Sequence, residues 1–137
     1  MPRKKHKVHW GPAGAFAIPR LLMDSKDFRE LSGSARKVLD VLGYQYNGNN
    51  NGNLAATHSM MNDWGGMAKA TLAKSLQELQ QRELIIKTRE NYRGRDGARC
   101  ALYALAWAPI DECPGKMLEV RATVTPPRKL SAEKRRA

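Results

Sequence analysis

This sequence lacks the features that mark secreted, membrane-spanning and metal-binding proteins. Its two cysteines, Cys100 and Cys113, are too few for a disulfide framework and have no metal-ligand spacing. The three histidines do not stand with them in the pattern of a zinc site. No apolar run approaches the roughly 18 residues of a membrane-spanning helix, and the charged N-terminus lacks the apolar stretch of a signal peptide. We therefore expect a cytoplasmic protein with neither a bound metal nor a membrane partner.

Motifs of catalysis and nucleotide binding are also missing. The stretch NGNNNGN (47–53) is glycine-rich like a phosphate-binding loop, but it lacks the Lys-Ser/Thr pair that such a loop needs. The carboxylates of residues 24–30 lie among basic residues, and Asp111-Glu112 stand in a loop, so neither group indicates general acid–base chemistry. We expect no enzyme activity, no cofactor and no small-molecule substrate.

Acidic residues are scarce, and this scarcity is the strongest indication of a partner. The 137 residues contain 24 Lys+Arg and only 13 Asp+Glu, for a net charge of +11. Residues 1–9 contribute +4 and residues 128–137 another +4, so only +3 remains for the middle. A basic protein with two basic ends favours nucleic acid over an anionic membrane surface, because such ends follow a phosphate backbone.

The middle of the chain predicts four helical regions. Residues 16–31 read as two short helical pieces, with Pro19 suited to a first helical position. Residues 32–46 form a longer helix capped by Ser32 or Ser34 and carrying apolar residues on one face. Thr57 caps a short helix that runs through Trp64 and ends at Gly65-Gly66. Residues 68–82 form the strongest helix, with a Leu72, Leu76, Leu79 stripe.

Two β-prone runs follow the last helix and predict a hairpin. They are LIIKT (84–88) and ALYALAW (101–107), and the basic tip between them carries the turn signal Asp96-Gly97. The asparagine stretch 47–53 is too short for a domain linker, so we interpret it as a turn before a short strand at Leu54. Gly48 and Gly52 would supply left-handed conformations in that turn.

The element order divides the chain into three parts. Residues 1–15 are a basic N-terminal arm, residues 16–107 one domain, and residues 108–137 a Pro-containing basic C-terminal arm. Helix, short strand, short helix, tight turn, long helix and hairpin give an α+β fold, a winged helix-turn-helix with a three-helix core.

A family resemblance agrees with this order. The stretch THSMMNDWGGMAKATLAKSLQELQQRELII (57–86) resembles the winged helix-turn-helix core of many bacterial and phage DNA-binding proteins. The stretch from Phe16 to Leu54 resembles small winged-helix proteins of prophages and plasmids, of the replication-initiator-like or regulatory type. Two positions depart from the family: Ala68 stands where Ser or Thr commonly caps the second helix, and Glu83 stands where Gly commonly follows it.

The predicted function is double-stranded DNA binding on the bacterial nucleoid, as a transcription regulator of a mobile element. Helix 68–82 would read the major groove, and arginines of the hairpin would hold phosphates. The candidate DNA-binding residues are Lys69, Thr71, Lys74, Gln77, Arg93, Arg95 and Arg99. Two alternatives stay open: origin binding in phage or plasmid replication, and a winged-helix module that binds a protein or RNA. A homodimer also stays open, through helix 20–31 or segment 109–127.

Overall fold

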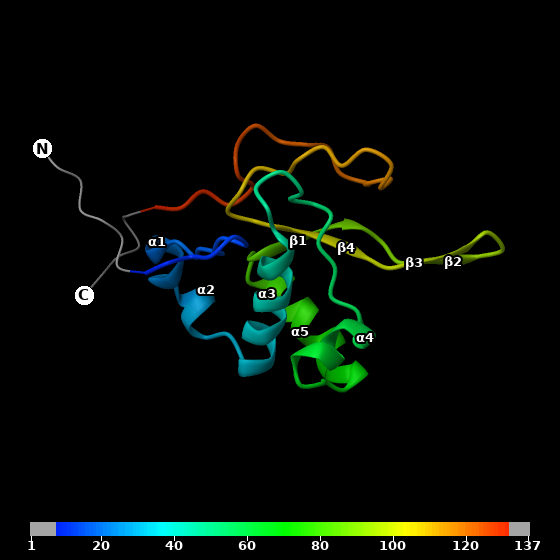
Figure 1. Ribbon diagram of the computed structural model, residues 1–137, viewed down its shortest axis with the longest axis horizontal. Coiled ribbons are helices and arrows are strands. Elements are labelled where there is room, and N and C mark those ends of the chain that lie inside the picture. The colour runs from blue at the N-terminus through cyan, green and yellow to red at the C-terminus, as the bar shows by residue number, and fades with distance from the viewer. Residues whose placement is uncertain (1–7, 132–137) are drawn as a thin grey trace, which may run out of the picture.

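The fold is α+β, with helices on one side of small antiparallel sheets. The computed structural model describes residues 8–131 (Figure 1). Its elements, in chain order, are α1 (Arg20–Met23), α2 (Lys26–Arg29), α3 (Gly33–Gln45), α4 (His58–Met61), the 3₁₀ helix η1 (Asn62–Trp64), α5 (Lys69–Gln81), β1 (Ile85–Arg89), β2 (Tyr92–Gly94), β3 (Gly97–Arg99) and β4 (Leu102–Leu105). The helices predicted at 32–46, 57–64 and 68–82 are confirmed to within one residue at their ends. The two short pieces predicted within 16–31 are α1 and α2, and Pro19 is the extended N-cap residue of α1, one position before the first helical residue where the sequence places it.

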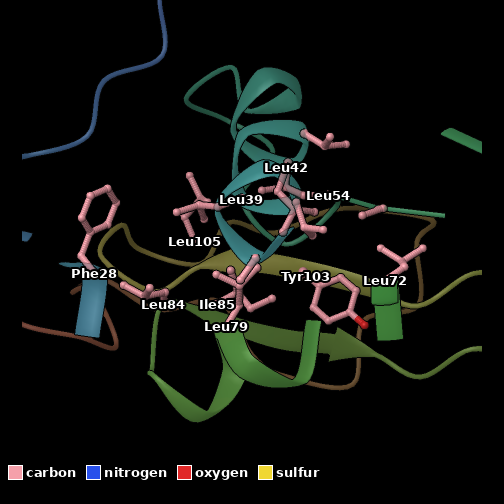
Figure 2. Packing of buried hydrophobic residues seen from close by; sticks show 14 of the residues in the cluster. Phe28, Leu39, Leu42, Leu54, Leu72, Leu79, Leu84, Ile85, Tyr103 and Leu105 are labelled. Carbon is pink, nitrogen blue, oxygen red and sulfur yellow. The ribbon is translucent and has the colours of Figure 1, made fainter. Parts of the chain in front are cut away.

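Helix α3 is the centre of the core. Ser32 is its N-cap, and the Ser32 hydroxyl accepts a hydrogen bond from the backbone N–H of Ala35. The inward face is buried, as its 3.6-residue spacing predicts, and α5 packs against it through Leu72 and Leu79. Figure 2 shows these leucines meeting side chains of β1 and β4 between helices and strands. The buried cluster includes Leu22, Phe28, Ala35, Val38, Leu39, Leu42, Leu54, Met61, Leu84, Ile85, Tyr103 and Leu105.

The end of α5 is a tight left-handed turn at Glu83. Glu83 has φ 57°, its N–H donates to the Gln80 carbonyl, and the Leu84 N–H donates to the Leu79 carbonyl. These two bonds form a Schellman motif, and the buried side chains of Leu79 and Leu84 supply its apolar contact. Because the sequence has no glycine here, it leaves open a different helix end or a strained Arg82 or Glu83, and the structure has the left-handed conformation at Glu83.

Glu83→Gly is expected to raise the free energy of unfolding by about 0.5–1 kcal/mol, because glycine removes the left-handed strain and only part of the gain is lost to a more flexible unfolded chain. Urea denaturation measures the change. Gln81→Gly is the matched control: Gln81 is exposed within α5, so glycine there should lower stability by up to about 1 kcal/mol. Equal destabilisation by both substitutions would contradict the strain at Glu83.

The strands form one long hairpin in two parts. Strands β1 and β4 pair antiparallel from Ile85↔Leu105 to Arg89↔Leu102, with an irregularity between Lys87 and Arg89. Strands β2 and β3 pair antiparallel at the hairpin tip (92–99), which projects to the right in Figure 1, at the end of the molecule away from α1. The hairpin predicted after the last helix is therefore confirmed.

The asparagine stretch 47–53 is an ordered turn whose centre is buried. Gly48 and Gly52 have φ 94° and 127°, as predicted. The short strand expected at Leu54 is a single antiparallel bridge to Tyr103. Two residues further along β4, the Asn51 side chain replaces a strand: its Oδ1 accepts from the Leu105 N–H at 2.7 Å, and its Nδ2 donates to the Leu105 carbonyl at 3.0 Å.

The C-terminal segment (108–131) has no helix or strand, yet hydrogen bonds hold it to the rest of the chain. Ile110 is buried, and the Asp111 backbone and carboxylate both bond to the backbone of Asn51. Near its end, the Arg128 N–H donates to the Ala106 carbonyl. In Figure 1 this segment runs along the strands on the side away from α4.

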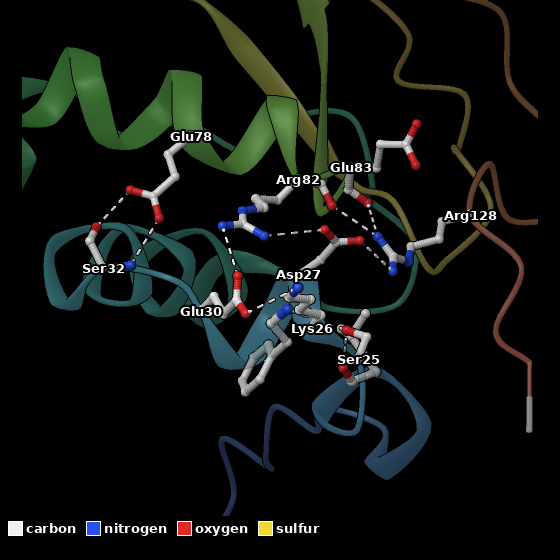
Figure 3. A network of polar contacts seen from close by, with 11 residues as sticks. Ser25, Lys26, Asp27, Glu30, Ser32, Glu78, Arg82, Glu83 and Arg128 are labelled. Atoms are coloured by element: carbon white, nitrogen blue, oxygen red, sulfur yellow. Dashed lines mark hydrogen bonds and ion pairs between the residues drawn. The ribbon is translucent and has the colours of Figure 1, made fainter. Parts of the chain in front are cut away.

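Arg128 joins the C-terminal segment to α2 and to the end of α5 (Figure 3). Its Nη1 donates to the carbonyls of Arg82 and Glu83 at 2.9 and 3.3 Å, and its Nη2 lies 3.0 Å from the Asp27 carboxylate. A cation at these carbonyls offsets the negative end of the helix dipole. The side chain of Arg128 is 18% exposed, so this member of the basic C-terminal end belongs to the folded body.

Candidate nucleic-acid interface

Helix α5 presents a polar face to solvent. Lys69, Thr71, Lys74 and Gln77 are all exposed, while Leu72 and Leu79 on the opposite face are buried. The acidic side chain within α5 is Glu78, and both of its carboxylate oxygens accept hydrogen bonds from Ser32. The exposed face therefore offers ammonium, hydroxyl and amide groups without a competing free carboxylate, which is the chemistry of a surface that contacts nucleic acid.

The Glu78 side chain is hydrogen-bonded to Ser32, the N-cap residue of α3 (Figure 3). Its two carboxylate oxygens accept from the Ser32 backbone N–H at 2.8 Å and from the Ser32 hydroxyl at 2.7 Å. The backbone hydrogen bond from Ser32 is the main cause that lowers the pKa of Glu78 below its usual value of 4.5. Arg82 and Lys74 contribute in the same direction.

Glu78→Gln is expected to lower the free energy of unfolding by about 1 kcal/mol at pH 7, because the amide cannot accept both Ser32 donors. A depressed carboxyl pKa stabilises the fold above the unfolded-state pKa, and this stabilisation is lost as the pH falls through the folded-state pKa. The difference between variant and wild type should therefore shrink below pH 4.5. Urea denaturation at pH 7 and pH 3 measures it, and a constant difference would contradict the role of the charge.

The first turn of α5 has no cap of its own. Ala68 is the N-cap residue and offers no side-chain hydrogen bond, as predicted, and the first turn contains no acidic residue. Leading backbone N–H groups in a helix lack internal acceptors and carry the positive end of the dipole. Lys69, the first residue of α5, adds a full positive charge at the same place. This end of α5 is therefore suited to an anionic partner.

The hairpin tip presents two of its three predicted arginines. Arg93 and Arg95 are exposed, and Arg95 lies in the turn between β2 and β3. Asp96, the acidic neighbour in that turn, accepts a hydrogen bond from the Tyr92 hydroxyl at 2.9 Å. Gly97, with φ 120°, closes the turn that the sequence predicts.

Arg99 is held differently from the other two. Its guanidinium lies over the Tyr92 ring, 4.7 Å from the centroid, and its Nη1 contacts the Met117 Sδ. These contacts place Arg99 between the hairpin tip and the C-terminal segment, so it is less available to a phosphate than Arg93 or Arg95. Sequence reasoning could not separate the three, because Met117 is distant in the chain.

Other basic residues of the prediction lie outside the described part of the chain. These are the arm residues Arg3, Lys4, Lys5 and Lys7 at one end, and Lys134, Arg135 and Arg136 at the other. Within residues 8–131, no three His, Cys, Asp or Glu side chains gather as metal ligands, and no helix is long and apolar enough to cross a membrane.

Comparisons with protein-family models, curated proteins and solved structures found no match for this chain. The chemistry of the exposed surfaces therefore carries the functional argument.

Proposed function

We propose that residues 16–107 are a winged helix-turn-helix domain that binds double-stranded DNA. One observation carries the proposal: α5 buries its leucine stripe on α3, leaves a polar face without a free carboxylate in solvent, and leads directly into a hairpin with arginines at its tip. The order Leu54, β4, β1 in the sheet also suits a winged helix. In this arrangement α5 enters the major groove and the hairpin tip contacts neighbouring phosphates.

The proposed role is transcription regulation in a mobile element. It rests on the resemblance of residues 16–54 to small winged-helix proteins of prophages and plasmids. Lys69, Thr71, Lys74 and Gln77 would face base edges and the nearest phosphates. A net charge of +11 would add affinity that is independent of sequence and sensitive to salt.

Selection from random DNA duplexes, and sequencing of DNA that co-purifies with the protein, test this function. An enriched duplex motif supports the proposal, and its occurrence in promoters or in origin repeats distinguishes regulation from replication. Failure to enrich any duplex, together with no gel shift at about 0.15 M salt, would contradict DNA binding and favour a protein or RNA partner.

A chain shortened to residues 8–131 is expected to keep the same motif but bind it more weakly, with a shallower dependence of log K on log salt. Each lost phosphate contact should reduce the slope by about 0.9. The deletion stops at residue 131 because Arg128 belongs to the folded body. Gel-shift titrations from about 0.05 to 0.3 M salt measure both quantities, and loss of motif preference would contradict this division between ends and domain.

A further inference from the structure

The hairpin contains a break that leaves its tip without a continuous ladder to the body. Pairing of β1 with β4 ends at Arg89↔Leu102, and pairing of β2 with β3 begins at Tyr92↔Arg99. Residues 90, 91, 100 and 101 belong to neither sheet. An isolated two-stranded hairpin is marginally stable in water. Something other than the ladder must therefore fix the direction of the tip relative to α5.

The Arg89 guanidinium spans this break. Its Nε and Nη2 donate to the Cys100 carbonyl on the opposite side of the hairpin, at 3.2 and 2.6 Å. Its Nη1 donates to the Lys116 carbonyl of the C-terminal segment at 2.9 Å. All three guanidinium nitrogens thus contact backbone carbonyls, and the planar, forked arrangement of these donors suits such a bridge. This occupation argues that Arg89 holds the hairpin and does not itself contact DNA.

The C-terminal segment makes three more contacts with the hairpin, one before, one within and one after the break. The Glu119 N–H donates to the Thr88 carbonyl at 2.7 Å, and the Glu119 carboxylate accepts from the Glu90 N–H at 3.2 Å. Beyond the break, the Met117 Sδ accepts a hydrogen bond from the Arg99 Nη1. The segment therefore contacts the hairpin before, at and after the interruption.

The same segment is fixed to the body at both ends. Asp111 pairs with the backbone of Asn51, and Arg128 is bonded to the end of α5 and to Asp27. Thr88, the residue at the irregularity in β1, is buried and donates its hydroxyl hydrogen bond to the Gly52 carbonyl at 2.6 Å. Segment, asparagine turn and hairpin base thus form one connected support.

We infer that Arg89 is a positioning residue: supported by the C-terminal segment, it fixes the direction of the hairpin tip and so places Arg93 and Arg95 for contact with DNA. The part that concerns DNA rests on the proposed function; the effect on the hairpin tip does not. The binding unit then extends beyond residue 107, because residues 116–119 supply the other half of the support.

The first test measures backbone NMR order parameters of the full chain and of Arg89→Ala. Order parameters of residues 92–99 should fall from about 0.8 to below about 0.6 in the variant, while those of α3 and α5 stay unchanged. Unchanged values at the tip would overturn the inference. This measurement needs no DNA, so it decides the positioning role even if the protein fails to bind duplexes and the proposed function is wrong.

The second test is a double-mutant cycle on duplex binding with Arg95→Ala. Arg89→Ala should weaken binding about tenfold, and the double variant should bind about as weakly as the weaker single variant, because Arg89 acts through the tip. Arg20→Ala on α1 removes the same charge far from the hairpin and should change binding less than twofold. If the double variant instead loses affinity by the product of the two single fold-losses, Arg89 and Arg95 act independently, and the positioning role of Arg89 is overturned.

Arg89→Lys separates geometry from charge in the same assay. Lysine keeps the charge but has one nitrogen, so it cannot reach the Cys100 and Lys116 carbonyls from separate atoms. Binding by Arg89→Lys should therefore be weakened nearly as much as by Arg89→Ala. Full recovery with lysine would mean that only the charge of residue 89 matters, and would overturn the inference.

Discussion

Asn51→Ala is expected to lower the free energy of unfolding by about 3–4 kcal/mol, a large part of the stability of a domain this size. The Asn51 side chain is fully buried. Its Nδ2 donates to the carbonyls of Leu105, Ala108 and Pro109, and its Oδ1 accepts from the Leu105 N–H. Alanine would leave the Leu105 N–H and the Ala108 carbonyl buried without these bonds and would remove a donor from the Pro109 carbonyl, whereas the Leu105 carbonyl keeps the Ala108 N–H at 3.5 Å. Each buried group left without a partner costs about 1–3 kcal/mol.

Urea denaturation followed by circular dichroism measures this effect. Asn49→Ala is the matched control, because Asn49 lies in the same turn with its side chain exposed, and its loss should change stability by less than about 0.5 kcal/mol. Asn51→Asp distinguishes hydrogen bonding from packing: it keeps the shape but directs oxygen at three carbonyl oxygens, so it should destabilise at least as much as alanine. Tolerance of either substitution at Asn51 would contradict its role as a substitute strand.

Local signals in the sequence predicted most of the helices and the hairpin. The caps at Ser32 and Thr57, the glycines after η1 and the leucine stripe of α5 each depend on neighbours within four residues. Such signals act through the backbone of their own element, so they can be recognised without knowing the tertiary fold. The absence of a side-chain cap at Ala68 follows from the sequence in the same way, whereas for the end of α5 the sequence leaves open a different helix end or strain at Arg82 or Glu83.

The long-range contacts could not be predicted from those signals. Asn51 reads as one asparagine among five in a polar turn, and only its meeting with Leu105, 54 residues later, gives it a structural role. Arg89 reads as one basic residue of the hairpin until its bonds to Cys100 and Lys116 are seen. In each case the decisive partner is a backbone carbonyl, whose position no side-chain pattern encodes.

The C-terminal segment illustrates the same limit. Its prolines and charge predict an irregular arm, and the structure assigns no helix or strand to residues 108–131. Irregular backbone can nevertheless be fixed when its N–H groups find acceptors elsewhere. Here Asp111, Glu119 and Arg128 donate backbone hydrogen bonds to Asn51, Thr88 and Ala106.

The combined charge reversal Lys74→Glu/Arg95→Glu is expected to weaken duplex binding about 100- to 1,000-fold at moderate salt. Each side chain lies exposed on one of the two proposed contact surfaces, α5 and the hairpin tip. Losing one good phosphate or base contact costs about 1–3 kcal/mol, and a carboxylate in its place adds repulsion from the phosphates. The fold should persist, because neither side chain is buried, although a carboxylate at position 74 would stand one turn from Glu78 and cost a few tenths of a kcal/mol.

Arg20→Glu/Lys26→Glu is the control that makes this result specific. It changes the net charge by the same amount on α1 and α2, where Lys26 is 81% exposed and forms only a loose pair with Glu30 at 3.8 Å. Non-specific attraction depends on total charge and should fall similarly in both double variants, whereas specific contact should be lost only in the first. Gel shifts with a selected duplex measure the affinity of each variant, and circular dichroism checks its fold. Equal losses of affinity in the two double variants would mean that α5 and the hairpin tip are not the DNA-contacting surface and that only the overall charge of the chain attracts DNA.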